Sequence, residues 1–293
     1  MPQFSPLASP SATRAFLERH DLYAKHHLGQ NFLISDWVVG KIVDLAELSS
    51  ADTVLEVGPG IGTLTYALLK RAALVVALEA DQTLEPALHE SCAEQLDKLH
   101  IVWGDALKTL TGSIPAEPNK FVANLPYQVA ATLVLSSFER LESIERAVVM
   151  VQAEVADRMA AQPKTKAYGA YTAKLALYAR VTGRFEVAAS NFMPAPHVTS
   201  SVIRLERSEA HDPDTGNALS RERLEQTSHV INAAFLQRRK TLRNSLAADG
   251  FEKVAIDVAC EAASIDASCR AETLSPLDFV RLTKELERVG QLP

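Results

Sequence analysis

The sequence has little cysteine and no apolar run long enough to predict a membrane-spanning helix. Its 3 cysteines form no CxxC motif, which argues against a disulfide framework and favours a reducing, cytosolic compartment. The longest uncharged stretch, residues 121–138, contains Asn124, Pro126 and Gln128, so a strand, a turn and a helix explain it better. The 8 histidines lack the spacing of metal ligands, and we expect neither a metal nor a membrane partner.

Positive charge is also scarce, because the chain has 30 Lys and Arg against 36 Asp and Glu and a formal net charge of −6. This balance argues against nucleic-acid binding over the whole surface. The basic residues are nevertheless concentrated in two stretches without Asp or Glu, residues 158–184 and 237–243. Each stretch is explained either by a solvated helix face or by a bound phosphate backbone. The second explanation assigns RNA binding to Arg158, Lys164, Lys166, Arg238, Arg239, Lys240 and Arg243.

Short β-rich apolar runs alternate with helical stretches between residues 53 and 151, which predicts an α/β domain with a parallel sheet. The predicted strands are Thr53–Val57, Leu74–Glu79, His100–Trp103, Lys120–Ala123 and Ala147–Val151. The chain starts with a Pro/Ser-rich segment, and a polar segment with Pro and Gly precedes a helical pattern near the end. We therefore expect a flexible segment over residues 1–20, an α/β domain over 21–207, a linker over 208–220 and a helical domain over 221–293.

A glycine-rich turn follows the first predicted strand and leads into a helix. Gly58, Gly60 and Gly62 are spaced as GxGxG, which differs from the GxGxxG pattern of dinucleotide-binding turns. Glu56 directly precedes the turn, where its carboxylate would repel a pyrophosphate and favour a cationic ligand. S-adenosyl-L-methionine carries a sulfonium and an amine, so the turn predicts this cofactor, bound at Gly58 and Gly60, rather than a dinucleotide.

Two more carboxylates follow the next predicted strands. Glu79 ends the second strand, where it could accept hydrogen bonds from two ribose hydroxyls. Asp105 follows the third strand, where it could accept a hydrogen bond from an adenine amino group. The alternative is that both are ordinary strand ends and helix caps. Because both stand at the C-terminal ends of successive strands, we favour cofactor binding.

The motif Asn124-Leu125-Pro126-Tyr127 comes directly after the fourth predicted strand. The exocyclic amine of adenine is a poor nucleophile, because its lone pair is delocalised into the ring. The Asn124 side-chain oxygen and the Leu125 carbonyl could accept its two N–H groups and stabilise the charge that develops during methylation. Tyr127 could stack on the base, and Pro126 would fix the turn. The sequence therefore predicts catalysis by Asn124, Leu125 and Tyr127.

Five motifs carry a resemblance to a known family: LGQNFL at 28–33, EVGPGIG at 56–62, NLPY at 124–127, NFMPAPHV at 191–198 and NAAFLQRRKTLRN at 232–244. Over roughly residues 20–290, the chain resembles the small-subunit ribosomal RNA adenine N6,N6-dimethyltransferase family (KsgA type). The resemblance implies a Rossmann-like, class I S-adenosylmethionine-dependent methyltransferase sheet. It also implies a C-terminal all-helical domain that binds RNA and the ribosome.

The family's reaction follows from the resemblance as an expectation. Members dimethylate the N6 amines of two adjacent adenosines in a loop near the 3′ end of small-subunit (16S-type) rRNA, with S-adenosyl-L-methionine as methyl donor. An adenine in a loop is easily placed in a pocket, because little stacking is lost. We expect a cytoplasmic monomer that acts on small-subunit rRNA in a pre-30S ribosomal particle during subunit biogenesis.

The resemblance also implies roles for individual residues. Asn31 and Leu33 cover the cofactor from an N-terminal arm, and Phe192 forms a second aromatic wall opposite Tyr127. The cofactor pocket is lined by Gly58, Glu79, Asp105 and Asn124.

Two departures from the family pattern each remove a positive charge near the expected RNA surface. Ala195-Pro196-His197 stands where Pro-Pro-Lys or Pro-Pro-Arg is common. Tyr168-Gly169-Ala170-Tyr171-Thr172 stands where Tyr-Gly-Arg-Leu-Ser is frequent. These departures concern RNA affinity rather than the chemistry.

Two other functions remain open. A macrolide-resistance methylase of large-subunit rRNA would share the glycine turn and a similar aromatic motif, but the helical domain with the motif at 232–244 argues against it. A non-catalytic ribosome assembly factor would use the same fold to hold RNA. The intact Asn124, Tyr127 and Glu79 argue against lost catalysis.

Overall fold

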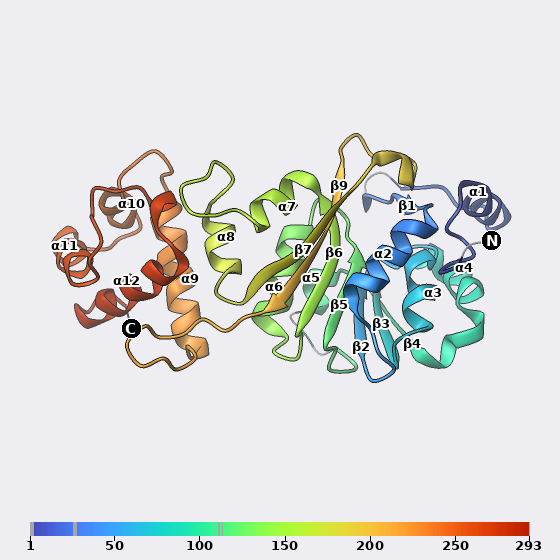
Figure 1. Ribbon diagram of the computed structural model, residues 1–293, viewed down its shortest axis with the longest axis horizontal. Coiled ribbons are helices and arrows are strands. Elements are labelled where there is room, and N and C mark those ends of the chain that lie inside the picture. The colour runs from blue at the N-terminus through green and yellow to red at the C-terminus, as the bar shows by residue number, and fades with distance from the viewer. Residues whose placement is uncertain (1–2, 26–27, 111, 113, 293) are drawn as a thin grey trace. The chain divides into compact units, whose positions relative to one another are not determined.

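The computed structural model describes residues 3–25, 28–110, 112 and 114–292. The chain forms two compact units (Figure 1). The first unit contains the chain up to Ala156 together with Val181–Arg207, and the second contains Asp157–Arg180 together with the chain from Ser208 onward. This division differs from the domain predicted over residues 21–207, because Asp157–Arg180 belongs to the second unit.

Contacts with the C-terminal helices explain why residues 157–180 join the second unit. The hydroxyl of Tyr168 donates a hydrogen bond to the Leu274 carbonyl at 2.8 Å. The buried Tyr168 ring packs on Phe235 with the ring centroids 6.1 Å apart. Because Tyr168 and Leu274 are 106 positions apart in the chain, no local sequence pattern reports their contact.

A sheet forms the centre of the first unit. Its strands are β2 (Thr53–Val57), β3 (Leu74–Glu79), β4 (Leu99–Trp103), β5 (Lys120–Asn124), β6 (Arg146–Gln152), β7 (Ala179–Val187) and β9 (Ser200–Arg207). The seven strands lie in the order β4-β3-β2-β5-β6-β9-β7, with β4 to β6 parallel and β9 antiparallel to β6. β3 and β6 are almost continuously buried, as expected of parallel strands covered on both faces. The predicted α/β fold is confirmed.

Helices pack on the sheet through apolar side chains. The helices of this part of the chain are α2 (Asp36–Ala46), α3 (Thr63–Leu69), α4 (Glu85–Ser91), α5 (Ala106–Thr109), α6 (Ala130–Arg140) and α7 (Ala153–Met159), with 3₁₀ turns η2 (Gln82–Leu84), η3 (Ala93–Lys98) and η4 (Ala189–Asn191). Val38 and Ile42 of α2 join Val54 of β2 and Val148 of β6 in one buried cluster. Burial of such side chains contributes most of the stability of this layer.

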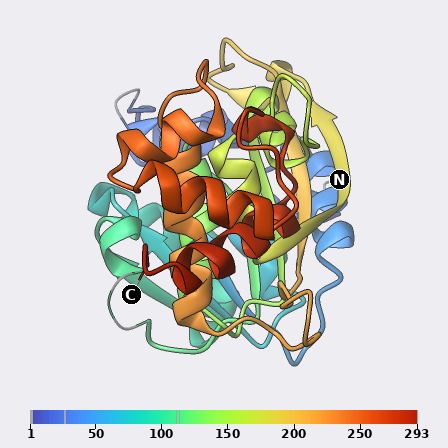
Figure 2. The same ribbon diagram turned by 90° about the vertical axis from the view of Figure 1, so that its left-hand side faces the viewer.

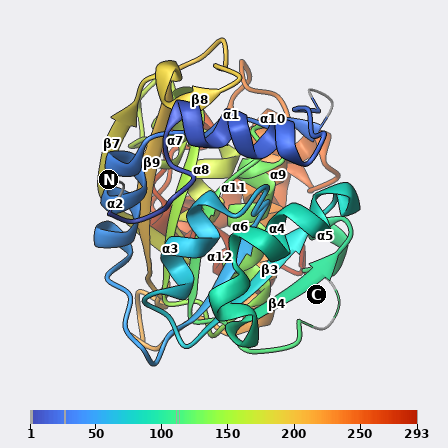
Figure 3. The same ribbon diagram turned by 90° about the vertical axis from the view of Figure 1, so that its right-hand side faces the viewer.

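The described part of residues 1–20 contains a helix, α1 (Pro10–Arg19), that the sequence pattern does not predict. Ser9 caps it by accepting a hydrogen bond from the Ala12 amide at 3.2 Å. Phe16 is buried in an apolar cluster, and Arg19 forms an ion pair with Glu90 of α4. Both helices, α1 and α4, are labelled in Figure 3. These contacts place the segment on the first unit, whereas the sequence predicts a flexible segment.

The second unit is built from helices. They are α8 (Ala170–Leu175), α9 (Arg221–Phe235), α10 (Leu242–Ala248), α11 (Lys253–Ala262) and α12 (Pro276–Arg288), with the 3₁₀ turn η5 (Ala271–Thr273). Phe235 contacts Tyr168 and Phe279 with centroid distances of 6.1 and 6.0 Å. Ser275 and Asp278 form a capping box at the start of α12. The predicted C-terminal helical region is confirmed, and α9 to α12 are seen in orange and red in Figure 2.

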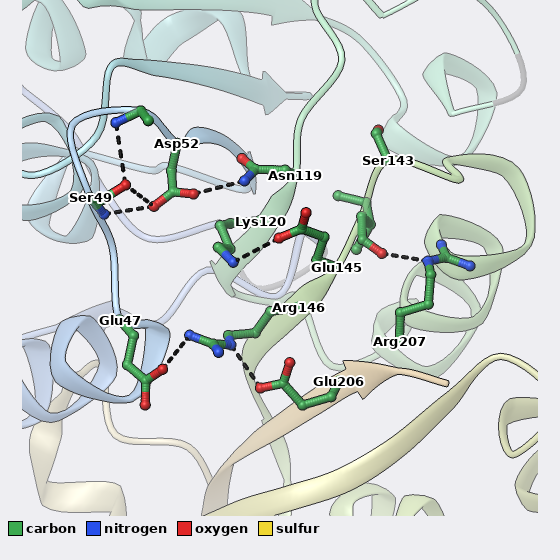
Figure 4. A network of polar contacts seen from close by, with 12 residues as sticks. Glu47, Ser49, Asp52, Asn119, Lys120, Ser143, Glu145, Arg146, Glu206 and Arg207 are labelled. Carbon is green, nitrogen blue, oxygen red and sulfur yellow. Dashed lines mark hydrogen bonds and ion pairs between the residues drawn. The ribbon is translucent and has the colours of Figure 1, made fainter. Parts of the chain in front are cut away.

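A polar network joins the N-terminal ends of the parallel strands (Figure 4). Arg146 at the start of β6 forms ion pairs with Glu47 and Glu206, each at 2.8 Å. Asp52 before β2 accepts a hydrogen bond from the Asn119 side chain before β5 at 2.7 Å. These contacts tie the strands together at the edge that lies opposite their carboxyl ends.

Candidate active site

A cavity of about 400 Å³ lies at the carboxyl ends of β2, β3, β4 and β5. Parallel α/β sheets bind their ligands at this edge, and the volume lies in the range of small-molecule sites. The cavity is lined by residues 28–33, 56–61, 63–64, 78–80, 104–107, 124–129 and 133. The structure thus brings together every residue predicted to bind the cofactor: Asn31, Leu33, Gly58, Gly60, Glu79, Asp105 and Asn124.

The glycine turn after β2 requires backbone conformations that other residues rarely adopt. Gly58 and Gly60 have φ angles of +75° and +59°. The Gly58 amide donates a hydrogen bond to the Leu78 carbonyl at 2.9 Å, which fixes the turn against β3. A Cβ atom on Gly60 would approach the Phe32 ring to 3.4 Å. The turn therefore keeps backbone, rather than side chains, at the floor of the cavity.

Glu56 places a buried carboxyl in the cavity lining. Its residue is 1% exposed, and its Oε2 atom has no hydrogen-bond partner among the residues that the structure describes. The pKa of Glu56 is raised to about 8, chiefly by burial; the Thr65 side chain opposes the rise and the neighbouring Glu79 carboxylate adds to it. A buried carboxyl without a partner is costly, so this position favours a cationic ligand.

Glu79 and Asp105 stand at the ends of neighbouring strands, as predicted. Glu79 is 7% exposed and accepts hydrogen bonds from the Gly60 amide at 3.1 Å and the Asp81 amide at 2.9 Å. Burial raises the pKa of Glu79, and these amides oppose that rise. Asp105 caps α5 by accepting from the Leu107 amide at 2.9 Å. Asp105 is therefore a helix cap and a cavity residue at once, so the two sequence interpretations are compatible.

Asn124 at the end of β5 is held by the N-terminal arm, which consists of Lys25 and residues 28–33 among the described residues. Its side-chain Nδ2 donates a hydrogen bond to the Asn31 carbonyl at 3.2 Å. A carbonyl can only accept, so this contact fixes the orientation of the Asn124 amide and directs Oδ1 away from the Asn31 carbonyl. Leu125 is anchored through its amide, which donates to the Met150 carbonyl at 3.1 Å.

Tyr127 completes this motif at the wall of the cavity. Its hydroxyl lies 2.6 Å from the Ser200 Oγ atom at the start of β9. Burial raises the pKa of Tyr127, so the phenol stays neutral at ordinary pH. The hydrogen bond restricts rotation of the side chain and holds the ring in place.

Phe192 lies on a short strand beside the N-terminal arm. It lies on the two-residue strand β8 (Phe192–Met193), which pairs antiparallel with β1 (Phe32–Leu33). The residue is 3% exposed, belongs to the core cluster with Leu33 and Val202, and does not line the cavity. The strand pair accounts for the burial of this residue, and its role as a second aromatic wall opposite Tyr127 stays a prediction.

Comparison with known proteins gives the family. The family model described as Ribosomal RNA adenine dimethylase matches residues 22–288. The chain belongs to this family. Membership confirms the resemblance drawn from the five motifs, and with it the expectation of an rRNA adenine dimethyltransferase.

Individual relatives agree with the family. The Ribosomal RNA small subunit methyltransferase A of Corynebacterium glutamicum (strain R) is 39% identical over 291 residues, covering 98% of both chains. A dimethyladenosine transferase from Plasmodium falciparum shares the fold, with a TM-score of 0.74 and 24% identity over 88% of this chain and 98% of that chain. The 23S rRNA methyltransferase ErmE has a TM-score of 0.64 and 26% identity, covering 88% of this chain and 100% of that chain. The predicted methyltransferase fold is therefore confirmed.

The basic residues assigned to RNA binding lie in the second unit. The Arg238 guanidinium donates a hydrogen bond to the Lys166 carbonyl at 2.8 Å, which brings the two basic stretches together. Arg239, Lys240 and Lys164 are exposed. Exposed cations that are close together suit a phosphate backbone, because its binding depends on local rather than net charge.

Arg243 and Arg238, both assigned to RNA binding, each form an ion pair, Arg238 with Glu272 at 3.7 Å and Arg243 with Asp257. The Arg243 guanidinium forms two hydrogen bonds with the Asp257 carboxylate of α11, at 2.6 and 2.7 Å. The arginine thereby raises the stability of the ionised carboxylate and holds the pKa of Asp257 below its usual value. This geometry connects α10 to α11, so the structure gives Arg243 a structural contact.

The sequence reasoning missed part of the arm. Lys25, Gln30 and Asp81 form a connected group next to the cavity. The only signal for it was the position of Gln30 within the LGQNFL motif.

Over the described residues, none of the helices is long and apolar enough to cross a membrane. The same part of the chain contains no cluster of three or more His, Cys, Asp or Glu that could hold a metal.

Proposed function

We propose that the protein transfers methyl groups from S-adenosyl-L-methionine to the N6 amines of two adjacent adenosines near the 3′ end of small-subunit rRNA. The observation that carries this proposal is that the oriented Asn124 amide and the carboxylate-lined glycine turn share one cavity. Family membership supplies the reaction class. The relative from C. glutamicum, which is named for the small subunit, supports the choice of substrate.

The lining of the cavity fits S-adenosyl-L-methionine. The unpartnered Glu56 Oε2 atom suits a cation and disfavours a pyrophosphate. Glu79 would accept hydrogen bonds from ribose hydroxyls, and Asp105 would accept one from the adenine amino group. When bound, the cofactor supplies a methyl group on a positively charged sulfur.

The chain's own residues would activate the target amine by electrostatics and positioning. Oδ1 of Asn124 and the Leu125 carbonyl accept its N–H groups and stabilise the positive charge that grows on nitrogen. The Tyr127 ring, held through Ser200, stacks on the base. No general base is needed before attack, because the amine loses its proton to solvent after the methyl has been transferred.

The exposed positive charges of the second unit support rRNA as the binding partner. The exposed cations of the second unit, Lys164, Arg239 and Lys240, contact rRNA phosphates. Arg158, Lys166 and Arg238 belong to the same basic region in the sequence. In this proposal the protein acts as a cytoplasmic monomer on the pre-30S particle.

A reconstituted methylation assay tests the proposal. The protein is incubated with isotopically labelled S-adenosyl-L-methionine and small subunits from a strain that lacks the modification. We expect dimethylation of two adjacent adenosines, mapped by mass spectrometry of rRNA fragments.

Because the chain shares its fold with ErmE, a 23S rRNA methyltransferase, the same assay is run with naked large-subunit rRNA for comparison. Methyl incorporation into that RNA, with none in small subunits, would contradict the proposal and favour the large-subunit alternative. Absence of cofactor binding by calorimetry would instead favour a non-catalytic assembly factor.

A further inference from the structure

The arm that lines the cavity is folded onto itself at its start. The Lys25 amide donates a hydrogen bond to the Gln30 side-chain oxygen at 2.9 Å. The Lys25 carbonyl accepts from the Leu28 amide at 3.0 Å and from the Gln30 amide at 3.4 Å. These contacts bring the side chains of Lys25 and Gln30 to the same side of the arm.

Asp81, two residues after Glu79, binds both of these side chains. Lys25 Nζ donates to Oδ1 at 2.7 Å, and Gln30 Nε2 donates to Oδ2 at 2.8 Å. Asp81 is 5% exposed. Burial raises its pKa, but hydrogen bonds from Lys25, Thr83 and Gln30 outweigh burial and hold the pKa at about 2. Asp81 is therefore an anion at any working pH. Its Oδ2 atom accepts from Gln30, and its Oδ1 atom accepts from Lys25 and also from the amide and hydroxyl of Thr83.

The next residue of the arm contacts the catalytic amide. Asn31 follows Gln30, and its carbonyl accepts the hydrogen bond from Asn124 Nδ2 at 3.2 Å. The Asn31 side chain donates to the Gly29 carbonyl at 3.0 Å, which stiffens this part of the arm. The position of the Asn31 carbonyl thus determines which way the Asn124 amide faces.

We propose that Asp81 is a positioning residue for methyl transfer: it holds the arm through Lys25 and Gln30, and the arm's Asn31 carbonyl turns the oxygen of Asn124 toward the target amine. This inference rests on the proposed function. Asp81 does not line the cavity, so it acts through the arm rather than on the substrate. Lys25, Gln30 and Asp81 are called the arm latch below.

Two variants open the latch from opposite sides. Asp81→Asn keeps the size of the side chain and one acceptor for the Thr83 amide, which Asp81 caps at 3.2 Å. It removes the charge and replaces one acceptor oxygen by an NH2 donor, which cannot accept the hydrogen bond that Lys25 or Gln30 donates to that oxygen. Lys25→Met removes the cation from the arm side and leaves Asp81 in place. Glu94→Gln is the matched control, because it breaks the exposed Lys70–Glu94 ion pair of the same unit at 2.9 Å.

Single-turnover kinetics at saturating cofactor and small subunits separate positioning from folding. If part of a variant preparation is unfolded, less methyl group is transferred in the single turnover, so the amplitude falls. If the Asn124 amide is mispositioned, the rate constant of methyl transfer falls instead. We expect the rate constant to fall by at least about tenfold in both latch variants, since small misplacements cost that much in oriented reactions. The double variant should be no slower than Asp81→Asn, because both changes break one latch. Hydrogen exchange of the amides of residues 28–33 should accelerate in the latch variants and not in Glu94→Gln.

Several results would overturn the inference. One is a latch variant in which the arm amides exchange faster than in the wild type while the rate constant of methyl transfer is unchanged. Another is a loss of amplitude alone, or additive losses in the double variant. If the wild-type protein transfers no methyl group to small subunits, the proposed function fails instead. The exchange comparison then still tests the latch, and unchanged exchange of the arm would refute it.

Discussion

At the residue scale, the account depends on which atom of the Asn124 amide faces the target. The Asn31 carbonyl accepts from Nδ2 at 3.2 Å, so the amide oxygen is directed away from the arm. An amide oxygen is a fixed dipole that needs no reorganisation as charge develops on the amine. Loss of this acceptor should therefore raise the free energy of the transition state more than it weakens binding of the cofactor.

Asn124→Ala should abolish detectable methyl transfer while the dissociation constant of the cofactor stays within about tenfold. The variant keeps the glycine turn and the carboxylates that hold the cofactor. Turnover assays and calorimetry on the same preparations measure the two quantities. Asn217→Ala, which changes an exposed asparagine of the second unit, is the control. Normal turnover in Asn124→Ala would remove this residue from its assigned role.

Glu56 makes cofactor binding depend on pH. Its pKa is raised to about 8 by burial, so the carboxyl is mostly protonated at neutral pH. A bound cation favours the ionised form, so binding should release a proton, and the dissociation constant should fall as the pH rises toward about 8. Above that pKa the contribution of Glu56 should level off.

Calorimetry in buffers of different ionisation enthalpy measures this proton release. The amine of the cofactor titrates in the same range, so the comparison is with Glu56→Gln. The variant should bind more weakly and release fewer protons than the wild type at neutral pH. Equal proton release by the two proteins would show that Glu56 is not the titrating group.

At the element scale, the turn between β2 and α3 brings backbone to the cavity floor. Gly60→Ala places a Cβ at a φ of +59° and 3.4 Å from the Phe32 ring. We expect a loss of stability of about 1 kcal/mol from the left-handed conformation. We also expect cofactor affinity to fall by about tenfold, because the new methyl group occupies the cavity floor.

Gly216→Ala is the matched control for this change. Gly216 has a φ of +71°, and a Cβ there would meet nothing within 4 Å. The stability loss should be similar, and cofactor affinity should be unchanged. Denaturant unfolding and calorimetry on both variants separate backbone strain from cavity filling. Equal loss of affinity in both variants would contradict the role of the turn.

The elements that the sequence predicts well are those defined by local pattern. The strands Thr53–Val57 and Leu74–Glu79 are observed with the predicted bounds. Their apolar runs and flanking turn residues are contiguous in the chain, so no distant contact is needed to recognise them. The carboxylates and the Asn124 motif are then placed correctly, because parallel strands end at one edge.

The features that the sequence did not predict depend on distant partners. Phe192 is buried because β8 pairs with β1, far away in the chain. Helix α1 gains its stability from Phe16 in a cluster with Phe32 and Ile61. The latch at Asp81 joins residues that are more than 50 positions apart, and hydrophobic periodicity carries no information on such contacts.

At the scale of the whole molecule, negative net charge coexists with an exposed basic region in the second unit. A phosphate backbone responds to local charge, so a chain with a net charge of −6 can still bind RNA there. The structure separates two kinds of basic residue. Arg243 is engaged with Asp257, whereas Arg239 and Lys240 are exposed.

Reversing the charges of Arg239 and Lys240 to Glu should weaken binding to small-subunit rRNA without loss of folding. The slope of log affinity against log salt should decrease by about one for each removed phosphate contact. Filter binding over a series of salt concentrations measures both quantities. The control is Arg288→Glu, an exposed arginine of α12 that pairs with Glu285. Unchanged affinity in the double reversal would assign these two cations to another role.

The measurement that tests the central claim most directly is a map of methyl groups on small-subunit rRNA from cells that lack this protein. The cells are complemented with the wild-type chain or with Asn124→Ala, and the rRNA is analysed by mass spectrometry. We expect two methyl groups on each of two adjacent adenosines near the 3′ end with the wild type, and none with the variant. The same methylation with Asn124→Ala, or unmodified adenosines with the wild type, would contradict the account.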